Sequence, residues 1–160
     1  MRGGVIKFAI VLYINLTTNA HAEVQLPSQV DLLAAYCTGV HTKRIQKWEA
    51  GDQNNLSAEQ GETFQRFVES MKSESTAHLQ RLRRYLLPRV PFLEGNGLLV
   101  AIQSGTNDVA LAEEDISSCL RTNVTCLTEG KFSDSCITHC LAKPVVARTI
   151  RCDSTNFLPQ

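Results

Sequence analysis

Residues 63–87 read TFQRFVESMKSESTAHLQRLRRYLL and carry the clearest helical pattern in the chain. Its apolar residues recur three or four positions apart, the spacing that places them on one face of an α-helix. Pro88 cannot continue a helix and ends the pattern. We therefore predict a long helix over residues 58–87, with a kink or a shallow contact where the polar Ser75 and His78 interrupt the face. The residues of this face are Phe64, Phe67, Val68, Met71, Leu79, Leu82 and Leu86.

Two further segments show the same spacing, one on each side of this stretch. Before it, Ser28 is placed to cap a helix whose apolar face extends to Trp48. After it, residues 98–119 form a third periodic segment, in which the small Gly105 and Ala112 would let another helix approach closely. The two faces consist of Val30, Leu33, Ala34, Cys37 and Val40, and of Leu98, Ile102, Gly105, Val109, Ala112, Ile116 and Cys119.

The segments after residue 119 are shorter. Ser133 is placed to cap a short fourth helix, which Pro144 ends. Residues 145–150 read VVARTI, a β-prone run that has no second strand to pair with, so we expect an extended tail lying on the bundle. The predicted fold class is all-α: a small bundle of three longer helices plus one short helix, disulfide-stapled, with an extended C-terminal tail.

Residues 1–22 have the pattern of a secretory signal peptide. Two basic residues precede a short, mostly apolar run over residues 8–16, and Ala20-His21-Ala22 supplies a small-x-small cleavage site. The run is far shorter than the roughly 20 apolar residues needed to span a bilayer. We expect cleavage after Ala22, a single helical domain over residues 23–160 with no membrane span, and a periplasmic or extracellular location.

Six cysteines form the strongest constellation, and all of them follow the signal peptide. An even number of cysteines in an exported chain favours disulfides, because the compartment is oxidising. Four of them lie within residues 119–140, on two segments that would face each other across a turn and pair in nested fashion. The remaining two would tie the first helix to the C-terminal tail. Of the 15 possible connectivities, the predicted set is Cys119–Cys140, Cys126–Cys136 and Cys37–Cys152.

Other chemistry for the same cysteines stays open at this point. Cys136, His139 and Cys140 lie close together, and Cys126 would supply a fourth ligand to a zinc ion. The C-x-x-C motif of many zinc and redox sites is absent from the chain. A metal- or redox-active cysteine protein of the cell envelope is therefore the alternative hypothesis for function.

Four arginines cluster near the end of the long predicted helix: Arg81, Arg83, Arg84 and Arg89. They are a candidate binding patch for an anion such as a phosphate, a lipid headgroup or a glycan. They also complement the negative end of the helix dipole. The second interpretation is favoured because 16 basic and 16 acidic residues leave the chain without net charge. The same balance argues against a nucleic-acid partner.

No catalytic constellation stands out in the sequence. Neither a G-x-S-x-G nor an H-E-x-x-H motif occurs, and His41, His78 and His139 are interpreted as surface or partly satisfied core residues. Glycosylation-type sequons occur at Asn55 and Asn123. The leading hypothesis is an exported, disulfide-stabilised helical protein without enzymatic activity or cofactor, which serves an unknown protein or envelope partner in a binding or structural accessory role.

One resemblance accompanies this hypothesis. Residues 32–40, LLAAYCTGV, together with the spacing of the late cysteines, resemble small secreted bacterial proteins of unknown function. The resemblance carries no catalytic motif, so it implies no activity for this chain.

Overall fold

A computed structural model describes residues 24–50, 58–122 and 134–159, and within these ranges the fold is helical and contains no β-strand. The predicted all-α bundle is confirmed. The predicted signal peptide, its cleavage site and both sequons lie outside the described residues. The long helices are α2 (Gln29–Ala50), α3 (Ala58–Leu86) and α4 (Gly95–Thr122). The shorter elements are the 3-10 turn η1 (Val90–Phe92), the helices α6 (Asp134–Leu141) and α7 (Pro144–Ile150), and the 3-10 turn η2 (Arg151–Asp153).

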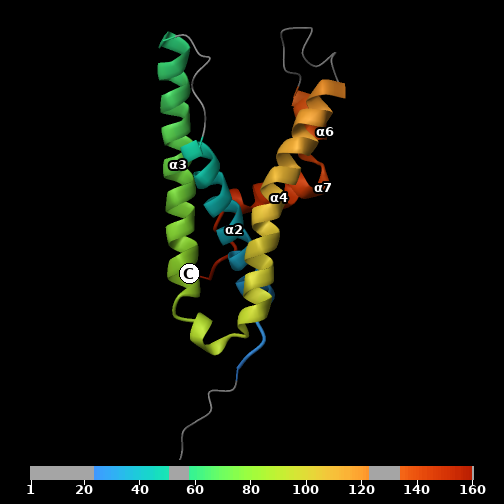
Figure 1. The fold of residues 1–160 in the computed structure, drawn as a ribbon. Coiled ribbons are helices and arrows are strands. Elements are labelled where there is room, and N and C mark those ends of the chain that lie inside the picture. Colours follow the sequence, from blue (N-terminus) through green and yellow to red (C-terminus); the bar gives the residue numbers. More distant parts are fainter. Residues whose placement is uncertain (1–23, 51–57, 123–133, 160) are drawn as a thin grey trace, which may run out of the picture.

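The three long helices form a V with a filled centre. Figure 1 shows α3 and α4 joined at the lower end and diverging upward. The central helix is α2, which packs against both arms, while α6 and α7 pack against α4. None of the helices in the described part of the chain is long and apolar enough to cross a bilayer.

The apolar faces predicted from the sequence form the core of the bundle. Leu82 on α3 has no exposed surface, and Cys37 and Val40 on α2 are equally buried. Phe67 departs from the prediction because its side chain is 52% exposed. It lies about 100° around α3 from Val68, and its ring meets Trp48 edge to face at a centroid distance of 5.9 Å.

The closest helix contact in the fold is the crossing of α2 and α4, where a glycine on each helix faces the backbone of the other. A Cβ atom placed on Gly39 would lie 2.0 Å from the carbonyl oxygen of Ile102. A Cβ atom on Gly105 would lie 2.0 Å from the carbonyl oxygen of Tyr36. The predicted role of Gly105 is therefore confirmed, and Gly39 is its counterpart on α2.

Polar contacts beside this crossing centre on Asp108 of α4. The hydroxyl of Tyr36 donates a hydrogen bond to Asp108 Oδ2 at 2.9 Å, and Arg148 Nε of α7 donates to the same oxygen at 3.2 Å. Burial and the hydrogen bond to Asp108 raise the pKa of Tyr36 to about 12. Asp108 thus joins α2, α4 and α7 through its side chain.

A second polar junction links the start of α2 to the end of α3. Ser28 caps α2 as predicted: its Oγ accepts a hydrogen bond from Asp31 N at 3.2 Å, and Ser28 N donates to Asp31 Oδ2 at 2.9 Å. Asp31 also accepts from the Tyr85 hydroxyl at 2.9 Å and pairs with Arg89 Nε at 3.2 Å. Burial acts to raise the pKa of Asp31, but these hydrogen bonds and the Arg89 charge lower it overall.

The extended tail begins later in the chain than the sequence suggests. Residues 144–150 form the helix α7, whereas residues 154–159 are the non-helical tail. Pro144 occupies the first turn of α7, where its fixed φ suits a helix. Val146 and Thr149, three residues apart, are both buried on the bundle. Tertiary packing therefore overrides the β-propensity of this run, while Phe157 and Leu158 pack the true tail against the core.

Candidate functional site

The candidate functional site is an apolar cavity of about 400 Å³ between the central helix and the helices around it. Its volume falls in the range of small-molecule pockets, about 300–1,000 Å³. Most of its walls are aliphatic or aromatic side chains, and four charged side chains also line it. The lining residues are Arg44, Lys47, Trp48, Phe64, Val68, Met71, Val109, Ala112, Glu113, Ile116, Leu141, Val146, Thr149, Ile150 and Asp153.

The wall formed by α3 is the N-terminal half of the apolar face that the sequence predicts for this helix. Toward the C-terminal end of α3, this face buries Leu82 in the core. Toward the N-terminal end, Phe64, Val68 and Met71 continue it at spacings of four and three residues, and they are half-buried and line the cavity. One helical stripe therefore serves two purposes: its C-terminal part packs in the core, and its N-terminal part lines the cavity.

The opposite walls come from α4 and α7. Val109 and Ala112 of α4 are buried, and Ile116 lies one turn further along the same face. Val146 of α7 has an exposed fraction of 1%. These walls belong to the α4–α7 contact, so the cavity is bounded by packed helices.

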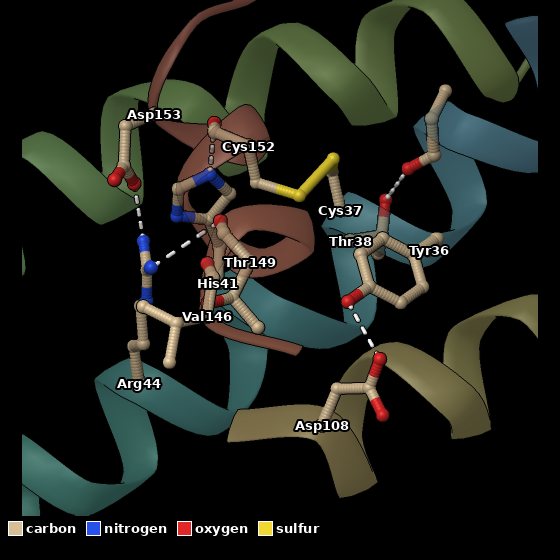
Figure 2. Close-up of a disulfide and its surroundings, with 11 residues drawn as sticks. Tyr36, Cys37, Thr38, His41, Arg44, Asp108, Val146, Thr149, Cys152 and Asp153 are labelled. Atoms are coloured by element: carbon tan, nitrogen blue, oxygen red, sulfur yellow. Dashed lines mark hydrogen bonds and ion pairs between the residues drawn. A yellow bond between two sulfur atoms is a disulfide. The ribbon is translucent and has the colours of Figure 1, made fainter. Parts of the chain in front are cut away.

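Two ion pairs cross between helices at the cavity, and both begin on α2. Arg44 pairs with Asp153 of η2, and its second guanidinium nitrogen donates to the carbonyl oxygen of Thr149 at 3.3 Å. Lys47, three residues after Arg44, pairs with Glu113 of α4. Figure 2 shows the Arg44 contacts. Each cation meets an acid, so the four charges around the cavity sum to zero.

The Arg44 end of the cavity is fixed by a disulfide. Cys37 of α2 is bonded to Cys152 of η2, as the sequence predicts, with Cα atoms 5.2 Å apart (Figure 2). His41 Nε2 donates a hydrogen bond to the carbonyl oxygen of Cys152 at 2.8 Å. The bridge and this hydrogen bond hold η2 in place, and with it Asp153, which lines the cavity.

Two of the three histidines that follow the predicted cleavage site lie together beside the Cys37–Cys152 disulfide. The rings of His41 on α2 and His78 on α3 are stacked. Neither Nδ1 atom finds a hydrogen-bond partner in the ranges that the structure describes. Burial lowers the pKa of His41, although the Cys152 carbonyl favours its protonated form. The sequence predicts core or surface histidines here, but it gives no sign that these two meet.

The second disulfide joins α4 to α6 and bears on the zinc hypothesis. Cys119 is bonded to Cys140 with Cα atoms 5.7 Å apart, which is the predicted pair. The bond takes Cys140 out of the predicted ligand set. The predicted Cys126–Cys136 bridge involves Cys126, which lies outside the described residues. Within the described ranges, no group of three or more His, Cys, Asp or Glu side chains is arranged to hold a metal ion.

The four arginines of the predicted anion patch differ in their contacts. Arg89 is engaged with Asp31 and lies over the Tyr85 ring at 4.6 Å from its centroid. Arg81 donates to the Thr155 hydroxyl of the tail at 3.4 Å. Arg83 and Arg84 are exposed in the last turn of α3. Of the four predicted residues, Arg83 and Arg84 are the two with no ion pair or side-chain hydrogen bond within the described residues.

The cavity itself is the feature that sequence reasoning missed. The spacing of four of the cavity's lining residues predicts buried helix faces, which is its usual meaning. They are Trp48, Phe64, Val68 and Met71. The available signal is length: α3 has 29 residues, whereas α2, which packs against it, has 22. Comparison of the chain with protein-family models, with curated proteins and with solved structures finds no match, so no function carries over from a relative.

Proposed function

We propose that the protein is an exported, disulfide-stabilised binding protein that holds a neutral, mainly apolar small molecule in the cavity between α2, α3, α4 and α7. The observation that carries the proposal is the cavity itself, about 400 Å³ in volume, with aliphatic and aromatic walls. Such a space is the usual setting for a small ligand. A purely structural role would be served better by filling it, because voids lower stability.

Two further observations support a binding role. Disulfides tie both ends of the C-terminal region to the bundle, Cys140 to α4 and Cys152 to α2. The cavity walls are thereby held in position before a ligand arrives, which lowers the entropic cost of binding. Two disulfides also suit an oxidising compartment and so support export.

The charge balance around the cavity selects the class of ligand. Arg44 is paired with Asp153, and Lys47 with Glu113. A charged ligand would have to displace one of these side chains from its ion-pair partner. Its charged group would also lose water on entering the apolar cavity, which costs free energy. A neutral molecule faces neither cost. The ligand we infer is an uncharged hydrocarbon body with at most a small polar end.

Isothermal titration calorimetry with hexan-1-ol, octan-1-ol and decan-1-ol tests this proposal. Each added CH₂ group should lower the dissociation constant by up to about fourfold, the factor that corresponds to burying one methylene. The gain should stop once the cavity is full. Decanoate and decyltrimethylammonium, which share the decyl chain, should both bind more weakly than decan-1-ol.

A matched pair of variants locates the site. Ile116→Phe adds volume inside the cavity and should abolish binding. Leu111→Phe lies on the same helix, at a position that is 49% exposed and outside the lining, and should bind as the wild type does. Absence of binding for all three alcohols would refute the proposal, as would equal binding by both variants. A free-thiol count of two or more would instead favour the metal- or redox-active alternative.

A further inference from the structure

The lower end of the V exposes several large apolar side chains at one place. On the connection from α3 to α4, Leu87 is 69% exposed, Val90 46% and Phe92 53%. Leu26, which is 81% exposed, belongs to the segment that runs beside this connection. Gln25 N donates to the Phe92 carbonyl oxygen at 2.9 Å, and Glu94 N donates to the Gln25 carbonyl oxygen at 2.9 Å. We call Leu26, Leu87, Val90 and Phe92 the apolar tip.

The apolar tip is an ordered part of the fold. Backbone hydrogen bonds close the connection on itself, from Arg89 N to Leu86 O at 2.8 Å and from Phe92 N to Arg89 O at 2.9 Å. The side chain of Arg89 anchors the connection to the buried Asp31. A defined backbone therefore holds these apolar side chains in solvent. Leu86 and Leu98 nearby are buried in the core, so apolar residues on both sides of the connection differ in whether they are covered.

Two cationic side chains lie on α3 just before the apolar tip in sequence. Arg83 and Arg84 are exposed in the last turn of α3, and no ion-pair partner for either lies within the described residues. Leu87 follows Arg83 by four residues, and Leu87 N donates to the Arg83 carbonyl oxygen at 2.8 Å as in a helix. The side chains of Arg83 and Leu87 thus lie on the same side of the helix. Leu99 and Val100, in the first turns of α4, add further exposed apolar surface nearby.

We propose that this end of the bundle docks on the surface of an anionic lipid bilayer. The apolar tip would enter the boundary between headgroups and acyl chains, while the guanidinium groups of Arg83 and Arg84 would meet lipid phosphates. The tip lies at the end of the bundle, where the chain turns from α3 to α4, so several side chains can enter a bilayer together (Figure 1). The site shares no residue with the cavity and does not depend on the proposed ligand.

Vesicle co-sedimentation with the full mature chain tests the proposal. The wild type should bind vesicles of equal parts phosphatidylglycerol and phosphatidylcholine, and bind pure phosphatidylcholine at least tenfold more weakly. Leu87→Gln with Phe92→Gln should lower the partition coefficient at least tenfold. Arg83→Gln with Arg84→Gln should lower it roughly 30-fold on anionic vesicles, the effect expected of two basic residues at the surface, and should remove most of its salt dependence.

The matched control is Leu111→Gln, an equally simple change at a half-exposed leucine of α4 roughly 24 Å along the helix from Gly95. It should bind vesicles as the wild type does, and denaturant unfolding should show that all variants are folded. The proposal is overturned if anionic vesicles bind no protein, or if Leu111→Gln weakens binding as much as the tip variants do. Sedimentation velocity that shows a wild-type dimer which Leu87→Gln dissociates would instead assign the tip to a contact between copies.

Discussion

The imidazole rings of His41 and His78 lie parallel, with centroids 5.1 Å apart and planes inclined by 12°. This stack joins α2 to α3 beside the Cys37–Cys152 disulfide. His41 Nε2 donates to the Cys152 carbonyl oxygen, so in the neutral ring Nδ1 carries no hydrogen. A second proton would have to enter on Nδ1, which is buried without a partner in the described part of the chain. Burial of this atom therefore favours the neutral ring of His41.

The first prediction is that the protein loses stability in mild acid because of His41. Burial lowers its pKa in the folded state, and the Arg44 charge acts in the same direction. The unfolded chain then binds more protons than the folded one below about pH 6.5, so the free energy of unfolding falls as the pH falls through that value. The loss is at most about 1.4 kcal/mol per pH unit for this one group. Urea unfolding at pH 8 and pH 5 measures it.

The control variants for this prediction separate His41 from other acidic effects. His41→Gln keeps a donor for the Cys152 carbonyl and should show a smaller loss between pH 8 and pH 5. His139→Gln, at an exposed position, should keep the wild-type loss. The pKa of Asp31 is lowered in the folded state, so its stabilisation disappears only below its ordinary value near 4. Identical pH profiles for the wild type and His41→Gln would contradict the assignment.

The second prediction concerns the crossing of α2 and α4. Gly39→Ala and Gly105→Ala each place a methyl group against a carbonyl oxygen of the opposite backbone, which cannot move aside as a side chain would. Each should destabilise the fold by about 2 kcal/mol or more, as overpacking does, despite the better helix propensity of alanine. Gly95→Ala is the matched control, since a Cβ atom there meets nothing within 4 Å. If all three variants unfold alike, the helices are not in close contact.

The third prediction concerns the order of importance of the disulfides. The Cys37–Cys152 bridge spans 115 residues and the Cys119–Cys140 bridge 21 residues. By the loop-entropy model their contributions are about 5 and about 3 kcal/mol. Cys37→Ser should therefore be the more destabilising change. It should free the thiol at position 152 and expose the chain to trypsin at Arg151.

Peptide mapping without reduction checks the pairing directly. In Cys37→Ser the Cys119–Cys140 fragment should remain, and in the wild type all six cysteines should be paired, with Cys126 joined to Cys136. A wild-type fragment that links Cys37 to any cysteine between residues 119 and 140 would contradict the pairing. A Cys37→Ser protein that is as stable as Cys119→Ser would contradict the proposed order.

Much of the fold follows from the sequence because periodicity reports which face of a helix is apolar. Periodicity predicts the apolar faces of α2, α3 and α4. Cys37 and Cys152 follow as the long-range pair because the other four cysteines have partners close in sequence. The prediction for residues 145–150 is wrong because valine and isoleucine favour strands, whereas the packing of α7 on α4, with Val146 and Thr149 buried, favours a helix. Local propensity depends on neighbouring residues in the sequence and does not include that tertiary contact.

The candidate site was beyond the reach of the same reasoning for a geometric reason. The spacing of Phe64, Val68 and Met71 shows that they share a face, but not whether another helix covers that face. The meeting of His41 with His78 depends on how far α2 and α3 are rotated and shifted against each other. Gly39 is visible in the sequence, yet its role requires knowing that Ile102 passes over it.

Contact quenching of Trp48 shows whether the cavity takes an apolar ligand. This residue lines the cavity and is the single tryptophan of the chain, so its emission reports on that site alone. Titration with 10-bromodecan-1-ol, whose bromine quenches at short range, should give saturable quenching that decan-1-ol reverses by competition and that Ile116→Phe abolishes. Quenching that rises without saturation, and equally in Ile116→Phe, would mean that the alcohol never occupies the cavity.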